Sequence, residues 1–97
     1  MEDDKKPASF DIAALDLPVL LGLFIDVLSV KAWQCMGLRV KPGSEKVEKD
    51  LDQARTAIDC VSFLMSKLDP HIKEDEKVKV RALLADLQIN FAKMAKP

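Results

Sequence analysis

The sequence predicts an all-α domain in which three main helices form an antiparallel helical bundle behind a flexible N-terminal tail. Two segments carry apolar residues in alternating steps of three and four, which is the period of an amphipathic helix. No stretch alternates polar and apolar residues between turn signals, so no strand is expected. A chain of 97 residues is long enough for one domain and too short for two, and we expect that domain over residues 10–97.

The first helix is predicted over residues 17–36. Residues 1–9 are polar and mixed in charge, which is typical of a disordered tail, and a short lead-in separates them from the helix. Asp16 can cap this helix, and Pro18 is tolerated in its first turn because backbone donors there lack intrahelical partners. Gly37 is expected to end it, since glycine accepts the left-handed conformation that often follows a helix.

The second helix is predicted over residues 50–68, after a polar connector with a proline–glycine–serine turn at residues 42–44. Asp50 and Gln53 have the spacing of a capping box, with aspartate in place of the usual Ser or Thr. Pro70 ends the helix, because the residue before a proline avoids helical geometry. The apolar stripe of this helix consists of Leu51, Ala54, Ile58, Val61, Met65 and Leu68.

The third helix is predicted over residues 74–95. Glu74, Asp75 and Glu76 place negative charge at the positive end of its dipole, and no calcium-loop spacing surrounds them. Its apolar stripe again advances in steps of four and three, through Val80, Leu84, Leu87, Phe91 and Met94.

The first helix differs from the other two because it is apolar on nearly every side. Its only polar side chains are Asp26, Ser29, Lys31 and Gln34. A helix that is apolar nearly all round must be covered nearly all round, and two partner helices cover about two of its sides. The helical wheel gives three apolar groups: Leu21, Phe24, Leu28 and Cys35; Leu23, Val27 and Val30; and Ile25 and Met36.

A second copy of the chain is the expected cover, because two-fold homodimers are the commonest soluble oligomers. We expect the bundle to be completed by dimerisation at the centre of the first helix. The predicted dimer interface consists of Leu21, Phe24, Ile25, Leu28, Ala32, Trp33 and Met36. The alternative is a monomer in which Phe10, Ile12 and Leu15 fold back over the open side.

Catalytic, cofactor, metal and nucleic-acid sites are not expected. His71 is the only histidine, and no cysteine or second histidine stands at a metal-ligand spacing from it. Nucleophilic catalysis needs a base beside Ser or Cys, and this single imidazole is the one available. No glycine-rich phosphate cradle appears, and a net charge of −1 gives no long-range attraction for nucleic acid.

We expect a cytoplasmic protein without a membrane span. Leu17–Val30 is shorter than the about 20 apolar residues of a spanning helix, and Asp26 interrupts it. The polar N-terminal residues do not fit a secretory signal. Cys35 and Cys60 fall within apolar helical patterns, which predicts buried free thiols. Asp26 is expected at the rim of its helix or paired with a basic group.

A spaced series of residues between about Leu20 and Ala92 carries a resemblance to a known family. The series is Lys31-Ala32, Met36-Gly37, Pro42, Asp50-Leu51, Ala54, Ile58-Asp59, Leu64, Lys67, Ile72, Glu76, Leu83-Leu84, Leu87 and Phe91. Its order and spacing resemble a bacterial family of small proteins catalogued as domain of unknown function number eighteen forty-four. The resemblance implies a helical, bacterial, cytoplasmic protein and supplies no activity.

The sequence departs from that family in one segment. Family members typically carry Lys-Thr-x-Gly-Asn-Leu between the second and third helices, where this sequence reads Lys67-Leu68-Asp69-Pro70-His71-Ile72. A role that depends on the glycine or asparagine of that turn is therefore not expected here.

Three functional hypotheses follow from these observations. The leading one is a non-enzymatic, homodimeric interaction module that acts as a scaffold or adaptor for another protein. The alternative is a helical carrier of an apolar small molecule or lipid, since surplus apolar surface can also line a pocket. A third is an enzyme that uses Asp26 or Asp59 with Lys31.

Overall fold

The computed structural model describes residues 11–96, and within this range the chain is helical and has no strand. The predicted all-α class with three main helices is confirmed. Each helix begins and ends within one residue of its predicted bounds. The predicted tail over residues 1–9 lies outside the described residues, as does Phe10. The elements are η2 (Ile12–Ala14), α1 (Leu17–Cys35), α2 (Leu51–Leu68), η3 (Asp69–His71) and α3 (Glu74–Met94).

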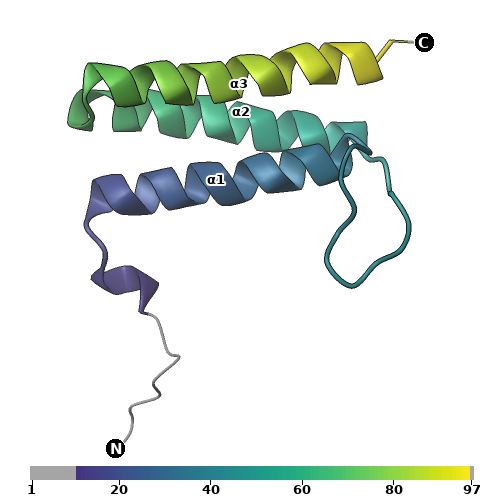
Figure 1. Cartoon of the computed structure of the whole chain (residues 1–97), viewed down its shortest axis with the longest axis horizontal. Helices are drawn as coiled ribbons and strands as arrows, with labels where there is room; N and C mark the ends of the chain where they lie inside the picture. Colours follow the sequence, from purple (N-terminus) through teal and green to yellow (C-terminus); the bar gives the residue numbers. More distant parts are fainter. Residues whose placement is uncertain (1–10, 97) are drawn as a thin grey trace, which may run out of the picture.

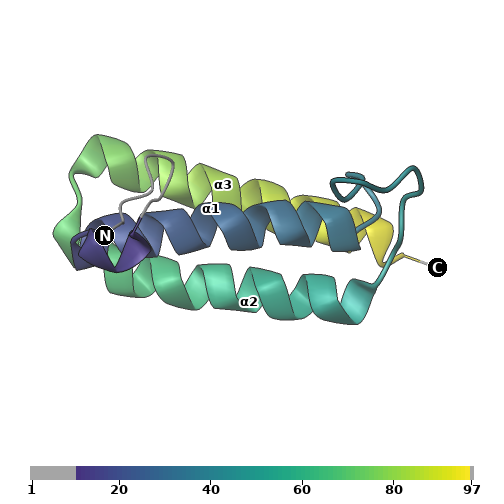
Figure 2. The same cartoon turned by 90° about the horizontal axis from the view of Figure 1, so that it is seen from below.

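The three helices lie side by side, and the chain reverses direction at each connection (Figure 1). In Figure 1, α1 lies below α2 and α3, and in the view from below in Figure 2 it lies between them. The axes of the three helices therefore form a triangle when they are viewed end on. The helices do not pack equally. α1 packs along α2, whereas α3 contacts α2 less and α1 least. The fold is therefore an α1–α2 hairpin to which α3 is attached.

The hairpin is closed by backbone bonds at the point where α1 ends and α2 begins. Gly37 adopts φ +82°, as expected for the residue that stops α1. The Asp50 backbone N–H donates to the Cys35 carbonyl oxygen at 2.7 Å, which ties the two ends of the connector together. The Asp50 carboxylate then accepts from the Gln53 backbone N–H at 3.1 Å and caps α2. The predicted start of α2 thus has the capping bond that its sequence indicated.

The Asp50→Ala variant is expected to lower the free energy of unfolding by about 1 kcal/mol, because the first turn of α2 loses its side-chain acceptor. Urea denaturation followed by circular dichroism measures this loss. Asp16→Ala is the matched control, since Asp16 precedes α1 but makes no capping bond with its side chain. The control should change the free energy by less than about 0.5 kcal/mol, and equal losses would contradict the capping role.

The core lies mainly between α1 and α2. Ile25, Ala32 and Met36 of α1 are buried there. The same buried cluster includes two small residues of α2, Ala54 and Ala57. α3 contributes two buried side chains from its predicted stripe, Leu84 and the fully buried Leu87, and the rest of that stripe packs partly buried against the core.

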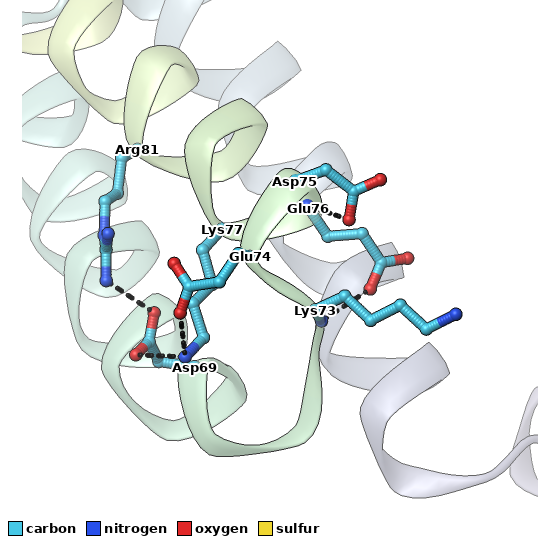
Figure 3. A network of polar contacts seen from close by, with 7 residues as sticks. All are labelled: Asp69, Lys73, Glu74, Asp75, Glu76, Lys77 and Arg81. Carbon is cyan, nitrogen blue, oxygen red and sulfur yellow. Dashed lines mark hydrogen bonds and ion pairs between the residues drawn. The ribbon is translucent and has the colours of Figure 1, made fainter.

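The turn between α2 and α3 is held by a network of charged side chains (Figure 3), in addition to the core contacts of Leu68 and Ile72. The Asp69 carboxylate pairs with Arg81 Nη2 at 3.2 Å and with Lys77 Nζ at 3.7 Å. Lys77 Nζ also lies 3.3 Å from Glu74 Oε2. The Glu76 carboxylate accepts from the backbone N–H before α3, which closes the first turn of that helix. This network fixes the segment in which the sequence departs from the resembled family.

Candidate interaction surface on helix α1

The side chains that the enzyme hypothesis requires lie in three separate places. Asp26 lines a groove between α1 and α3. Lys31 lies at a small cavity beneath the connector, and Asp59 lines surface hollows on α2. Within residues 11–96 no group of His, Cys, Asp and Glu side chains is arranged to hold a metal ion. Asp26, Lys31 and Asp59 therefore do not share one cavity.

The side of α1 that faces away from α2 and α3 is apolar and exposed. We call it the outer face of α1, and it consists of Val19, Leu20, Leu23, Phe24, Val27 and Val30, of which Val19 at the edge also lines the groove between α1 and α3. Val27 at its centre exposes 57% of its surface, and Val19 and Phe24 are also exposed. Leu20, Leu23 and Val30 are partly exposed. Asp26 and Lys31 border the outer face on opposite sides.

The residues predicted for the dimer interface divide into two groups. Ile25, Ala32 and Met36 are fully buried in the chain's own core, so they have no surface to offer a second copy. Leu21, Leu28 and Trp33 are partly buried against the same core, and Phe24 alone is exposed. The interface that we propose below therefore drops the three core residues and keeps Phe24.

Of the residues on the outer face, the sequence-based interface included only Phe24. The helical wheel placed Leu23, Val27 and Val30 together on one side, but the interface was assigned to another side. The signal that separates the two sides lies in α2, where small residues mark the helix surface that accepts α1. Polar residues on α1 give little guidance, because Ser29 and Gln34 are both buried.

The lead-in does not cover the outer face. Ile12 is exposed and η2 has no buried residue. Figure 1 shows η2 (purple) set off from the first turn of α1, on the side of α1 away from α2 and α3. The alternative in which Ile12 folds back over α1 is therefore not the arrangement seen, and Leu15 remains partly exposed.

A second apolar feature is the groove between α1 and α3. Its volume is about 550 Å³, and Ile25, Leu68, Val80 and Leu83 contribute to its lining. Gly22 also lines it, and no atom lies within 4 Å of the position that a Cβ would occupy there. The groove exists because α3 contacts α1 so little. A volume of this size falls in the range of small-molecule sites.

The two cysteines occupy different environments. Cys35 is buried in the core, as predicted, but Cys60 is exposed, so its predicted burial was wrong. Cys60 lies on α2 off the stripe that faces α1, next to Asp59 and Phe63 in a surface hollow. Both thiols are free.

Iodoacetamide is expected to add to one thiol per native chain, at Cys60, because access rather than residue type separates the two thiols. In denaturant both thiols should react. Mass spectrometry of the intact protein, followed by peptide mapping, measures this difference. Cys60→Ser is the control and should remove the native adduct, whereas modification of Cys35 in the native protein would contradict its burial.

By length and composition alone, α1 is long and apolar enough to cross a membrane. The mean hydropathy over an 18-residue stretch of α1 reaches 1.4, and 22% of that stretch is buried inside the chain. The core helix of a soluble protein meets the same criterion, so this observation does not distinguish the two settings.

A family model described as a domain of unknown function (DUF1844) matches residues 18–93. The chain belongs to this family. The matched DUF1844 region begins in the first turn of α1 and ends in the last turn of α3, so it comprises the three helices and the connector. The resemblance inferred from the order and spacing of residues is confirmed. Comparison with curated proteins and with solved structures gives no match.

Proposed function

We propose that this chain is a non-enzymatic interaction module that works as a homodimer and acts as a scaffold or adaptor for another protein. The observation that supports the proposal is the exposed outer face of α1. Each aliphatic or aromatic side chain that is fully buried contributes about 1.5–3 kcal/mol. Covering the outer face with a second copy would thus add several kcal/mol, comparable to much of the net stability of a small domain.

Size-exclusion chromatography with light scattering tests the homodimer. The expected mass is twice the 10.8 kDa of one chain over micromolar concentrations. A constant mass near 10.8 kDa at every concentration would overturn the proposal. Vesicle flotation provides a second arm, because insertion of α1 into a bilayer is the other way to cover its outer face. We expect the protein to stay unbound with phosphatidylcholine vesicles, and flotation would contradict both the absence of a membrane span and the cytoplasmic location.

The groove between α1 and α3 favours one alternative function, the carriage of an apolar small molecule or lipid. Native mass spectrometry of freshly purified protein tests it, since a carrier would show added mass above that of the chain. Gly22→Leu is the matched variant, because the added side chain would extend into open space in the groove. Under the carrier alternative the variant would lose the added mass. Under our proposal the wild-type chain carries no added mass, and the wild type and Gly22→Leu are both dimers.

The proposal includes no catalytic activity, cofactor, metal ion or nucleic-acid partner. Its support is the separation of Asp26, Lys31 and Asp59, which line different cavities. The net charge of −1 also provides no attraction for a polyanion.

A further inference from the structure

We propose that two copies pair through α1 in parallel, with Asp26 of each copy beside Lys31 of the other. This inference rests on the proposed homodimer and specifies its geometry. It follows from the register of the outer face and from the charges that border it.

The outer face carries the repeat of a helix–helix seam. Leu20, Leu23, Val27 and Val30 advance in steps of three, four and three, which is the spacing of the a and d positions in a heptad. The stripe therefore keeps to one side of α1 over its first four turns. The next position in the series is Gln34, which is buried within the chain, so the seam ends there.

The residues that border this seam are complementary only when the helices run in the same direction. In a parallel pair, the residue just before each a position lies beside the partner residue that comes five positions later in the sequence. Asp26 precedes Val27, and five positions further along is Lys31. The same offset brings Val19 beside the partner's Phe24, and both of these side chains are exposed in the single chain. The two-fold axis repeats each contact.

An antiparallel pair would bring like charges together. In an antiparallel pair centred on the middle of the seam, Leu20 would lie opposite the partner's Val30, and Asp26 would lie close to the partner's Asp26. Like charges opposed across an interface disfavour that arrangement. Within residues 11–96 neither Asp26 nor Lys31 makes an ion pair in its own chain, so both remain available for the parallel pairing.

Two elements flank the outer face. Figure 1 shows the connector and η2 at opposite ends of α1, both on the side of α1 away from α2 and α3. The outer face lies between them.

Disulfide cross-linking tests the direction of the pairing. In a Cys60→Ser background, Leu20→Cys and Val30→Cys are each oxidised alone and then as an equimolar mixture. A parallel pair predicts that each variant cross-links to itself, because identical residues face one another across the two-fold axis. Cross-links that form only in the mixture would show an antiparallel pair and overturn the inference while leaving the dimer intact. Asp86→Cys, exposed on α3, is the control and should give no cross-link.

Charge reversal tests the predicted ion pairs. Asp26→Lys and Lys31→Asp should each raise the dimer Kd about tenfold, because each variant alone places like charges in both flanking positions. An equimolar mixture of the two should recover the wild-type Kd, since every flanking pair in the mixed dimer is then of opposite charge. Unchanged Kd values for the single variants would overturn the ion pairs. A monomeric wild-type protein would instead overturn the homodimer itself.

Discussion

The Val27→Asp variant is expected to be a monomer of 10.8 kDa under conditions in which the wild-type chain is a dimer. Val27 lies at the centre of the outer face, and the proposed two-fold axis places it opposite its own copy. Two valines lose their burial at about 2 kcal/mol each, and two carboxylates would have to be buried instead. The dimer Kd should rise at least about a thousandfold. Light scattering over a concentration series measures the change.

The same substitution should leave the fold of each chain unchanged, because Val27 is 57% exposed and makes no part of the core. Its helical circular dichroism should match that of wild type. Val78→Asp is the control, since Val78 is a 62% exposed valine on α3. A dimer that survives Val27→Asp but dissociates with Val78→Asp would show that the wrong face had been assigned.

The Leu87→Ala variant is expected to lower the free energy of unfolding by about 2–5 kcal/mol, the usual cost of truncating a fully buried leucine. Leu87 is fully buried, and Leu84 is the only other buried residue on α3. Its loss removes much of what holds α3 against the α1–α2 hairpin. We therefore expect hydrogen exchange to accelerate along α3 more than along α1 or α2.

Urea denaturation measures the loss of stability. Ile89→Ala, two residues along the same helix, is the control because Ile89 is exposed. It should change the free energy by no more than about 0.5 kcal/mol. If Leu87→Ala were as mild as the control, α3 would not depend on this contact. Exchange that accelerated equally in all three helices would mean that the fold unfolds as a single unit.

The bounds of the helices could be predicted because local chemistry determines them. Asp50 caps α2 through its own side chain, and Gly37 takes the left-handed conformation that ends α1. Neither feature depends on a distant part of the chain. The acidic first turn of α3 is likewise a local signal, and it lies at the predicted place.

The orientation of α1 could not be predicted, because a helix that is apolar on all sides gives its wheel no preferred direction. The choice is made by the packing on α2, which buries Ile25 and Ala32 in one cluster with Ala54 and Ala57. Cys60 was misplaced for a related reason. Cysteine is usually buried, but Cys60 lies off the apolar stripe of α2. Its place on the helix therefore determined its exposure more than its residue type did.

The hydrogen bond between the Asp50 backbone N–H and the Cys35 carbonyl oxygen has a practical consequence for handling this protein. Because it fastens the segment from Met36 to Lys49 at its base, the tip of that segment can be lengthened without shifting either flanking helix. The entropic penalty of lengthening such a closed loop grows only slowly with the number of added residues. Gly43 has open space around it. A fluorophore-binding peptide inserted there would report on the protein's associations while leaving its helices in register.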